Sequence, residues 1–280
     1  MGIATLSVGG AALVADVTGA GACVILLHAG VADRRMWRTT CEALSGKFKC
    51  IAYDRRGFSD STSPDEAFRS IDDLDAVIRH FGCERAHLIG SSQGGRIAID
   101  YALAKPENVL SLVLVAPALS GASVPSSYPP TIQRLMDELE QAETTADLEK
   151  MNAIEARMWL DGPLSSENRV TGPACDLFLD MNGRALKQAP LNHEQFAPSA
   201  AEHLHRLTQP VFMIWGDADF PHIKDRSRLM ANTIPSARHL VMEDCAHLPN
   251  MERPRQFDAA VLEFLTGLSS SHRNEPHFGP

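Results

Sequence analysis

The chain has 280 residues, of which 44% are hydrophobic and 22% are charged, and its formal net charge is −9. This is the composition of an ordinary globular protein with enough apolar residues for a sizeable core, and it argues against a fibrous or fully disordered chain. Nothing in this acidic balance suggests a nucleic acid or an anionic membrane surface as partner. We expect a small-molecule substrate and a monomer or homodimer.

The six cysteines are scattered along the chain without the Cys-x-x-Cys spacing of a zinc site. We therefore expect reduced, mostly packed thiols, with no disulfide framework, no metal and no cofactor. No basic segment precedes an apolar run near the first residue, and no apolar stretch is long enough to span a bilayer. These features together predict a cytoplasmic protein.

Strands and helices alternate in the first part of the chain. Residues 3–8 and 11–17 predict two short strands joined as a hairpin at Gly9 and Gly10. Apolar runs and helical periodicity then predict strands at 23–27, 49–53, 86–89 and 109–115, and helices at 34–44, 70–81 and 96–102. This order favours a mostly parallel sheet with helices on both faces, which binds ligands beyond the carboxyl ends of its strands.

Residues 118–208 interrupt the alternation. Amphipathic patterns predict helices at 131–143, 145–160 and near 174–185, without a clear strand. The simplest interpretation is a helical lid inserted after the sixth strand. A plain helical decoration is the alternative, and only the position of the helices relative to the pocket distinguishes the two.

The alternation resumes after residue 208. Strands are expected at 211–215 and 238–242, and helices at 224–233 and 255–268. The predicted organisation is therefore a first part of the core, a lid, a second part of the core and a disordered tail, at residues 1–117, 118–208, 209–268 and 269–280.

A Gly-x-Ser-x-Gly sequence with Ser92 at its centre lies between the predicted strand 86–89 and the helix that follows. A serine hydroxyl is a weak nucleophile unless it is held exposed beside a base, and a tight strand-to-helix turn holds it in this way. Gly90 and Gly94 leave the room that such a turn requires. Ser91 does not fit the pattern, because the residues two positions away on either side are not glycine. Ser92 is therefore the predicted nucleophile.

Side chains suited to assist Ser92 follow the last two predicted strands. Asp219 comes shortly after the strand at 211–215, and His247 comes shortly after the strand at 238–242. The chain order Ser, Asp, His is used by one fold that carries a catalytic triad. We predict that His247 is the general base and that Asp219 orients it, since all three residues follow strands of one sheet.

Both assignments have rivals within the sequence. Asp217 is an alternative acid, with Asp219 then a helix cap. His222 and His239 are alternative bases, but His222 leads into a predicted helix and His239 lies inside a predicted strand. The loop position of His247 favours it over both.

Acyl transfer also requires hydrogen-bond donors for the oxyanion that develops on the substrate. One predicted donor is the backbone N–H of Gln93, directly after the nucleophile. The second is expected in the turn after strand 23–27, at the N–H of Gly30, with Val31 as the alternative.

Taken together, these motifs resemble the α/β-hydrolase family over residues 24 to 268, apart from the insertion. The matching segments are Leu27-His28-Ala29-Gly30, Asp54-Arg55-Arg56-Gly57-Phe58-Ser59, Gly90-Ser91-Ser92-Gln93-Gly94-Gly95, Trp215-Gly216-Asp217-Ala218-Asp219 and Ala246-His247-Leu248-Pro249. The resemblance implies the α/β-hydrolase fold and favours Asp219 over Asp217 as the acid. The chain departs from the family at Ala29, where a glycine is usual. This departure leaves open which residue of the turn supplies the oxyanion donor.

Within that family the chain looks most like small esterases and enol-lactonases of the 3-oxoadipate type. The resemblance implies a serine hydrolase that cleaves a small, largely apolar carboxylic ester or lactone through an acyl-enzyme on Ser92. The alternatives on the same fold are a carbon–carbon bond hydrolase of ring-cleavage products, a cofactor-free oxygenase and a slow-turnover ligand receptor. Four polar side chains of the expected lid are suited to contact a substrate carboxylate or carbonyl: Arg157, Asn182, Arg184 and His193.

Overall fold

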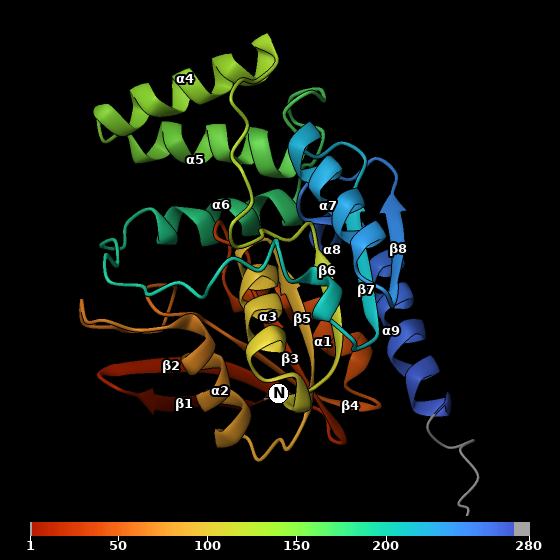
Figure 1. Cartoon of the computed structure of the whole chain (residues 1–280). Helices are drawn as coiled ribbons and strands as arrows, with labels where there is room; N and C mark the ends of the chain where they lie inside the picture. The colour runs from red at the N-terminus through yellow and green to blue at the C-terminus, as the bar shows by residue number, and fades with distance from the viewer. Residues whose placement is uncertain (1, 272–280) are drawn as a thin grey trace, which may run out of the picture.

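The computed structural model describes residues 2–271, which form one eight-stranded sheet flanked by helices (Figure 1). In chain order the strands are β1 (Gly2–Val8), β2 (Ala11–Thr18), β3 (Ala22–Leu27), β4 (Phe48–Tyr53), β5 (Ala86–Ser91), β6 (Val109–Val115), β7 (Val211–Gly216) and β8 (Ala237–Met242). Their order in the sheet is β1-β2-β4-β3-β5-β6-β7-β8. The pairs β1–β2 and β2–β4 are antiparallel and all other pairs are parallel, which confirms the predicted mostly parallel sheet.

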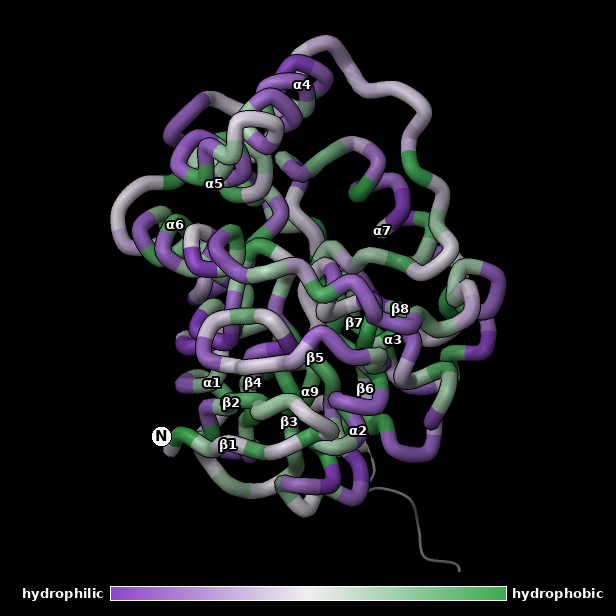
Figure 2. The backbone as a smooth tube through the Cα atoms, turned by 90° about the vertical axis from the view of Figure 1, so that its left-hand side faces the viewer, coloured by the Kyte–Doolittle hydropathy of each residue, from purple (hydrophilic) through white to green (hydrophobic). Residues whose placement is uncertain are grey.

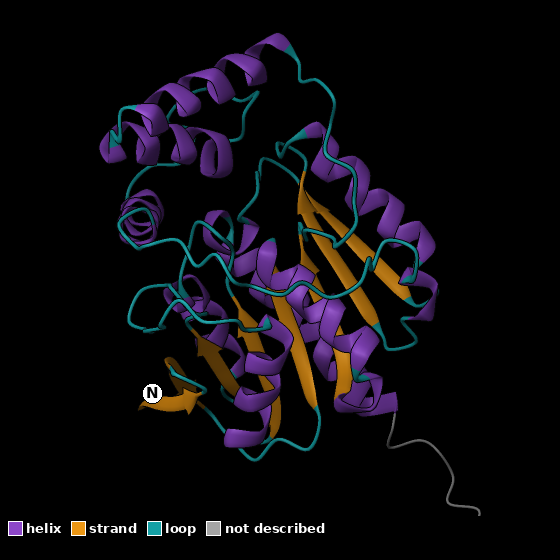
Figure 3. Cartoon of the chain, turned by 60° about the vertical axis from the view of Figure 1, so that its left-hand side comes forward, coloured by secondary structure: helices purple, strands orange, loops and turns teal. Residues whose placement is uncertain are grey.

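Helices cover both faces of the sheet (Figure 3). One face packs against α1 (Arg38–Leu44), α8 (Pro249–Glu252) and α9 (Pro254–Ser271). The other packs against α2 (Ser70–His80), α3 (Gln93–Ala104) and α7 (Pro221–Thr233).

The central strands are buried on both faces. In β3, Val24 and Leu26 join the core beneath α1 and α9, whereas Ile25 and Leu27 join the core beneath α2 and α3. Successive side chains of a strand point to opposite faces, so a strand with helices on both sides must be apolar throughout. This explains the continuous apolar run at this position, and the hydrophobic colour in Figure 2 is concentrated in the sheet.

The chain between β6 and β7, residues 116–210, is called the insertion below. It contains α4 (Pro130–Thr144), α5 (Leu148–Ala156), a π-helical turn (Arg157–Asp161) and α6 (Pro173–Ala185). Figure 1 shows these three helices stacked beyond the end of the sheet toward which the arrow of β8 points, which is the carboxyl end of the parallel strands. The helix predicted from residue 145 begins later, because the Asp147 side chain accepts from the N–H of Lys150 and caps the first turn.

The last helix is slightly longer than predicted. It ends at Ser271, whereas the sequence predicts its end at residue 268 and a disordered tail from 269. The remainder of that predicted tail, residues 272–280, lies outside the described residues. Within residues 2–271, none of the helices combines the length and the apolar character that crossing a membrane requires.

The prediction of six reduced thiols is wrong for two of them, since the structure contains a disulfide bond between Cys23 and Cys83. The two residues lie far apart in sequence, but Cys23 is in β3 and Cys83 comes shortly before β5, which pairs with β3. Strand pairing brings their Cα atoms to 6.1 Å, within the range that a disulfide spans. Local cysteine spacing carries no information about such a pair. The other four cysteines are free thiols, as predicted.

Reduction of the Cys23–Cys83 bond is expected to lower the free energy of unfolding by about 4 kcal/mol, because it frees a long loop in the unfolded chain. The two cysteines are 60 residues apart in sequence. Urea denaturation with and without dithiothreitol measures the effect. The Cys83→Ser variant is the control, and its transition should not respond to dithiothreitol. An unchanged wild-type transition, with reduction verified by mass, would contradict the expectation.

Candidate active site

After β3 the chain adds β4 on one side of β3 and then adds β5 on the other side of β3. The direction in which successive strands are added to the sheet therefore reverses at β3. At such a point two loops diverge and leave a crevice beyond the carboxyl ends of the strands. Leu27 at the end of β3 pairs with Gly90 near the end of β5, so the two ends lie level. The segment that follows each strand, with Gly30 in one and Ser92 in the other, therefore opens onto the same crevice.

Ser92 occupies the tight strand-to-helix turn that the sequence predicts. It lies between β5 and α3 with φ 51°, a conformation that a non-glycine residue rarely adopts. A Cβ atom on Gly90 would come within 2.5 Å of the Gly94 carbonyl oxygen, and one on Gly94 within 2.3 Å of the Leu27 carbonyl oxygen. The turn therefore closes only with glycine at both positions, and the backbone strain is concentrated at Ser92.

His247 and Asp219 form a buried hydrogen-bonded pair. The Nδ1 atom of His247 lies 2.8 Å from Oδ2 of Asp219, and the two residues are 2% and 1% exposed. The other carboxylate oxygen of Asp219 accepts from the N–H of Phe220 at 2.7 Å. Since the carboxylate is the acceptor, Nδ1 of His247 carries the proton and Nε2 keeps the lone pair that a general base needs.

The structure also distinguishes the predicted pair from its rivals. Asp217 is exposed, two residues before the buried Asp219. His239 lies in β8, and its ring stacks on Trp215 at 5.4 Å. His222 lies in the first turn of α7 against Phe220. None of the three takes part in the pair between His247 and Asp219.

The nucleophile candidate is not joined to this pair by a hydrogen bond. Ser92 is half-buried, and within residues 2–271 its hydroxyl has no hydrogen bond to His247. Backbone hydrogen bonds nevertheless hold Ser92 at the same edge of the sheet. The Ser92 N–H donates to the carbonyl oxygen of Val115 at the end of β6, and β6 pairs with β7, which leads to Asp219. Catalytic contacts of a free enzyme are often open and close when substrate binds.

The His247 loop is held by Glu252, a residue to which the sequence alone gives no role. Its buried carboxylate accepts from the N–H groups of Ala246 and Leu248, on either side of His247. Arg169 of the insertion pairs with the same carboxylate and also donates to the carbonyl oxygen of Asp244 at 2.5 Å. No local sequence pattern predicts the contacts with Arg169, because Arg169 and Glu252 come from distant parts of the chain.

Trp159 is a second residue whose position the sequence does not reveal. It lies in the π-helical turn of the insertion, and its ring is 4.8 Å from that of His247 and 4.8 Å from that of Phe220. Its carbonyl oxygen accepts from the N–H of His247 at 3.2 Å. π-Helical turns are frequent at functional sites, and here the turn brings an apolar ring onto the candidate base.

Three backbone N–H groups near Ser92 are available to a ligand. Those of Gly30, Val31 and Gln93 have no acceptor among residues 2–271. A Cβ on Gly30 would lie 2.7 Å from Nε2 of Gln93, so the turn after β3 approaches the start of α3 closely. The N-terminus of a helix favours negative charge, and this arrangement suits an oxyanion. Val31 remains an alternative donor to Gly30.

His28, next to these donors, is a structural residue. Its Nδ1 donates to the Ala29 carbonyl oxygen at 2.7 Å, and its Nε2 accepts from the N–H of Arg55 at 3.0 Å. Burial lowers the pKa of His28 well below its ordinary value, so the ring is neutral at pH 7. It therefore connects the turn after β3 to the turn after β4.

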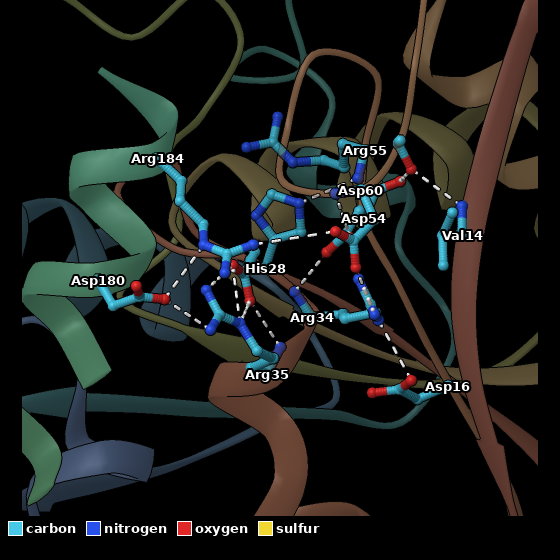
Figure 4. A network of polar contacts seen from close by, with 12 residues as sticks. Val14, Asp16, His28, Arg34, Arg35, Asp54, Arg55, Asp60, Asp180 and Arg184 are labelled. Carbon is cyan, nitrogen blue, oxygen red and sulfur yellow. Dashed lines mark hydrogen bonds and ion pairs between the residues drawn. The ribbon is translucent and has the colours of Figure 1, made fainter. Parts of the chain in front are cut away.

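A network of charged side chains around the buried Arg34 and Asp54 holds the turn after β4 (Figure 4). Asp54 accepts from the backbone N–H of Arg34 at 2.8 Å, and the Arg34 guanidinium pairs with Asp54, with Asp16 at 3.2 Å and with Asp60 at 2.8 Å. Figure 4 shows the side chain of Arg55 directed away from this network.

A cavity of about 350 Å³ adjoins the candidate oxyanion donors. Gly30 and Gln93 line it from the core, and Glu155 and Asn182 line it from the insertion. Ser92 and His247 are not among the described residues that line it, so the cavity reaches the candidate site from the side of the oxyanion donors. Of the four polar side chains singled out in the expected lid, Asn182 is the one in its wall.

Comparison with known proteins finds relatives that are named as a lipase and as hydrolases. A family model described as alpha/beta hydrolase fold matches residues 23–254. Monoacylglycerol lipase ABHD6 of Rattus norvegicus is 28% identical over 270 residues, which cover 90% of this chain and 77% of that protein. The 2-hydroxy-6-oxononadienedioate/2-hydroxy-6-oxononatrienedioate hydrolase 2 of Pseudomonas putida is 28% identical over 263 residues, which cover 86% of this chain and 87% of that one.

Solved structures of esterases have the same fold. The malate-bound esterase of Thermogutta terrifontis superimposes with a TM-score of 0.73 at 25% identity, over 95% of this chain and 97% of that chain. The esterase RhEst1 of Rhodococcus sp. ECU1013 has a TM-score of 0.77 at 24% identity, over 96% of this chain and 100% of that chain. Since the family model spans most of the sheet and the turns that follow its strands, the chain belongs to the α/β-hydrolase fold family.

Proposed function

We propose that this chain is a serine hydrolase that cleaves a small, largely apolar carboxylic ester or lactone through an acyl-enzyme on Ser92. The observation that carries the proposal is the buried pair of His247 and Asp219 at the sheet edge where β5 delivers Ser92 in its strained turn. The names of the relatives agree with it, since a lipase and esterases are among them.

In the first half of the reaction, Nε2 of His247 takes the proton of the Ser92 hydroxyl while the Ser92 oxygen attacks the carbonyl carbon of the substrate. Asp219 stabilises the imidazolium that forms, because its carboxylate accepts from Nδ1. The carbonyl oxygen becomes an oxyanion that the N–H groups of Gly30 and Gln93 bind. When the carbon–oxygen bond breaks, the leaving alkoxide takes the proton from His247, and the acyl group stays on Ser92.

In the second half, a water molecule replaces the alcohol. His247 takes a proton from this water, and the resulting hydroxide attacks the acyl-enzyme carbonyl, with the same two N–H groups binding the oxyanion. Collapse returns the proton to Ser92 and releases the carboxylic acid. We propose that the insertion acts as the lid of this site, because Trp159 covers the His247 ring and reduces its contact with solvent.

Hydrolysis of a carbon–carbon bond is the second candidate, and the relative from Pseudomonas putida favours it by its name and its coverage of both chains. The two reactions differ in the bond that breaks and therefore in the substrate. Spectrophotometric assay of a vinylogous 1,5-diketone ring-cleavage product beside a short-chain 4-nitrophenyl ester distinguishes them.

Labelling with a fluorophosphonate, followed by intact mass measurement, tests the proposed nucleophile without requiring the natural substrate. We expect one added label on the wild-type protein, located on Ser92 by peptide mapping. Ser92→Ala should remove the label, and His247→Ala should slow the labelling strongly, because the serine loses its base.

His239→Ala serves as the matched control, since His239 lies on β8 against Trp215 and outside the proposed site. This variant should be labelled at the wild-type rate. Labelling that persists in Ser92→Ala, or that depends on His239, would contradict the proposed function.

A further inference from the structure

Arg55 differs from the other buried arginines in its lack of a carboxylate partner. Arg34, Arg55 and Arg56 are 6%, 8% and 7% exposed. Arg34 forms ion pairs with three carboxylates, and Arg56 forms ion pairs with Glu66 and Asp73. Among residues 2–271, Arg55 forms no ion pair. A buried charge without a counterion is costly, so an unpaired arginine in a cavity wall requires an explanation.

The contacts of the Arg55 guanidinium are with neutral groups. Its Nη2 donates to Oε1 of Gln93 at 3.1 Å and to the carbonyl oxygen of Ala29 at 3.4 Å. The guanidinium carbon lies 4.3 Å from the centre of the Phe58 ring. Its Nε is buried and has no hydrogen-bond acceptor. Although burial lowers the pKa of Arg55 to about 10, the group stays charged at neutral pH.

Arg55 lies in the wall of the cavity that adjoins the candidate oxyanion donors. The Asp73 and Glu194 carboxylates line the same cavity, and each already has an arginine partner. The third carboxyl group in the wall, Glu155, accepts from Nδ2 of Asn182 at 2.5 Å and forms no hydrogen bond with Arg55, and burial raises the pKa of Glu155 above its ordinary value. Among the described residues that line the cavity, Arg55 is therefore an arginine without a direct ion pair, and Glu194 acts on it only through a longer-range Coulomb attraction.

We propose that Arg55 binds a carboxylate of the substrate, so that the preferred substrate is an ester or lactone that carries a free carboxylate. The inference rests on the proposed function and names the class of substrate for the same site. A guanidinium binds a carboxylate through parallel hydrogen bonds, and Arg55 stands in the cavity wall without a carboxylate partner of its own. Because Arg55 contacts Ala29 and Gln93, the carboxylate would lie beside the scissile carbonyl's oxyanion donors.

The alternative is that Arg55 only positions Gln93, whose N–H is a candidate oxyanion donor. Loss of a positioning contact would slow all esters alike, whether charged or neutral. Loss of a carboxylate-binding contact would raise KM for charged esters and leave neutral esters nearly unaffected. The two roles therefore differ in how the effect depends on substrate charge.

Monomethyl glutarate and dimethyl glutarate provide the comparison, since they share the scissile ester and differ in one carboxylate. For the wild type we expect kcat/KM to be at least about tenfold higher for the monoester. Arg55→Met should raise KM for the monoester by about 10- to 100-fold and change kcat/KM for the diester by less than about threefold. Arg55→Lys should restore part of the preference, because it keeps the charge.

The matched control is Arg184→Met, which removes a half-exposed arginine of the insertion outside the cavity wall. It should leave the preference for the monoester unchanged. Circular dichroism checks the fold of each variant, and Arg55→Met leaves no carboxylate orphaned.

The outcomes separate the inference from the function on which it rests. The carboxylate site would be overturned if the wild type had equal kcat/KM for both esters, or if Arg55→Met lowered kcat/KM equally for both. Neither result would contradict the proposed serine hydrolase. If neither ester is hydrolysed, the thermal shift with glutarate decides. Stabilisation of the wild type but not of Arg55→Met would support the carboxylate site, and no shift in either protein would overturn it. The fluorophosphonate labelling of Ser92 decides the proposed function separately.

Discussion

Replacement of Ser92 by alanine is expected to lower kcat on a short-chain 4-nitrophenyl ester by about 10⁵-fold, which corresponds to about 7 kcal/mol of transition-state stabilisation. The loss is large because alanine removes the atom that forms the acyl-enzyme, and the remaining groups can only assist attack by water. Steady-state kinetics with enough protein to detect the residual rate measures the effect. The oxyanion donors and the binding cavity stay in place, so KM should change much less than kcat.

Ser91→Ala is the control for this variant, because it makes the same chemical change one residue earlier. Ser91 is fully buried in β5, and its hydroxyl has no hydrogen-bond partner. Removal of an unsatisfied buried hydroxyl is expected to leave stability unchanged or slightly raised and to leave activity within about twofold of wild type. If Ser91→Ala were inactive and Ser92→Ala active, the assignment of the nucleophile would be wrong.

Asp219→Asn is expected to lower kcat by about 10⁴-fold without disturbing the fold. The Asn carbonyl oxygen can still accept from the N–H of Phe220, which turns the amide NH₂ toward Nδ1 of His247. Nδ1 must then be the acceptor and the ring proton moves to Nε2, where it prevents removal of the Ser92 proton. The pH dependence of kcat/KM, measured with the same ester, should lose the limb that reports ionisation of the histidine.

Asp217→Asn is the matched control and decides between the two aspartates that the sequence left as rivals. Asp217 is exposed, and its side chain takes no part in the His247 pair. We expect wild-type kcat and an unchanged pH profile. Near-normal turnover in Asp219→Asn together with a large loss in Asp217→Asn would reverse the assignment of the acid.

The sheet could be predicted because its strands are long apolar runs separated by turns. Val211 to Trp215 and Val109 to Val115 are apolar at almost every position, and only a strand buried on both faces requires this. The boundaries in the insertion were less accurate. The helix expected over 145–160 begins at Leu148 and ends in a π-helical turn, which no periodicity distinguishes from an α-helix.

The candidate site was predictable where chemistry requires a local pattern. The glycines around Ser92 are demanded by sterics within a few residues of chain, so the motif appears in the sequence. The roles of Glu252 and Arg55 were not predictable, because they depend on groups that only the fold brings together. The Cys23–Cys83 bond escaped prediction for the same reason, since it joins neighbouring strands rather than neighbouring residues.

The contact between Arg169 and Glu252 has a consequence for protein engineering. Arg169 belongs to the insertion, whereas the buried Glu252 carboxylate supports the backbone on both sides of His247. A chimaera with an inserted segment that lacked an arginine at this place would leave Glu252 buried without its cation and would loosen the histidine loop. The segment is therefore not a modular part that can be exchanged for a new specificity, and a functional graft must carry Arg169 with it or redesign both residues together.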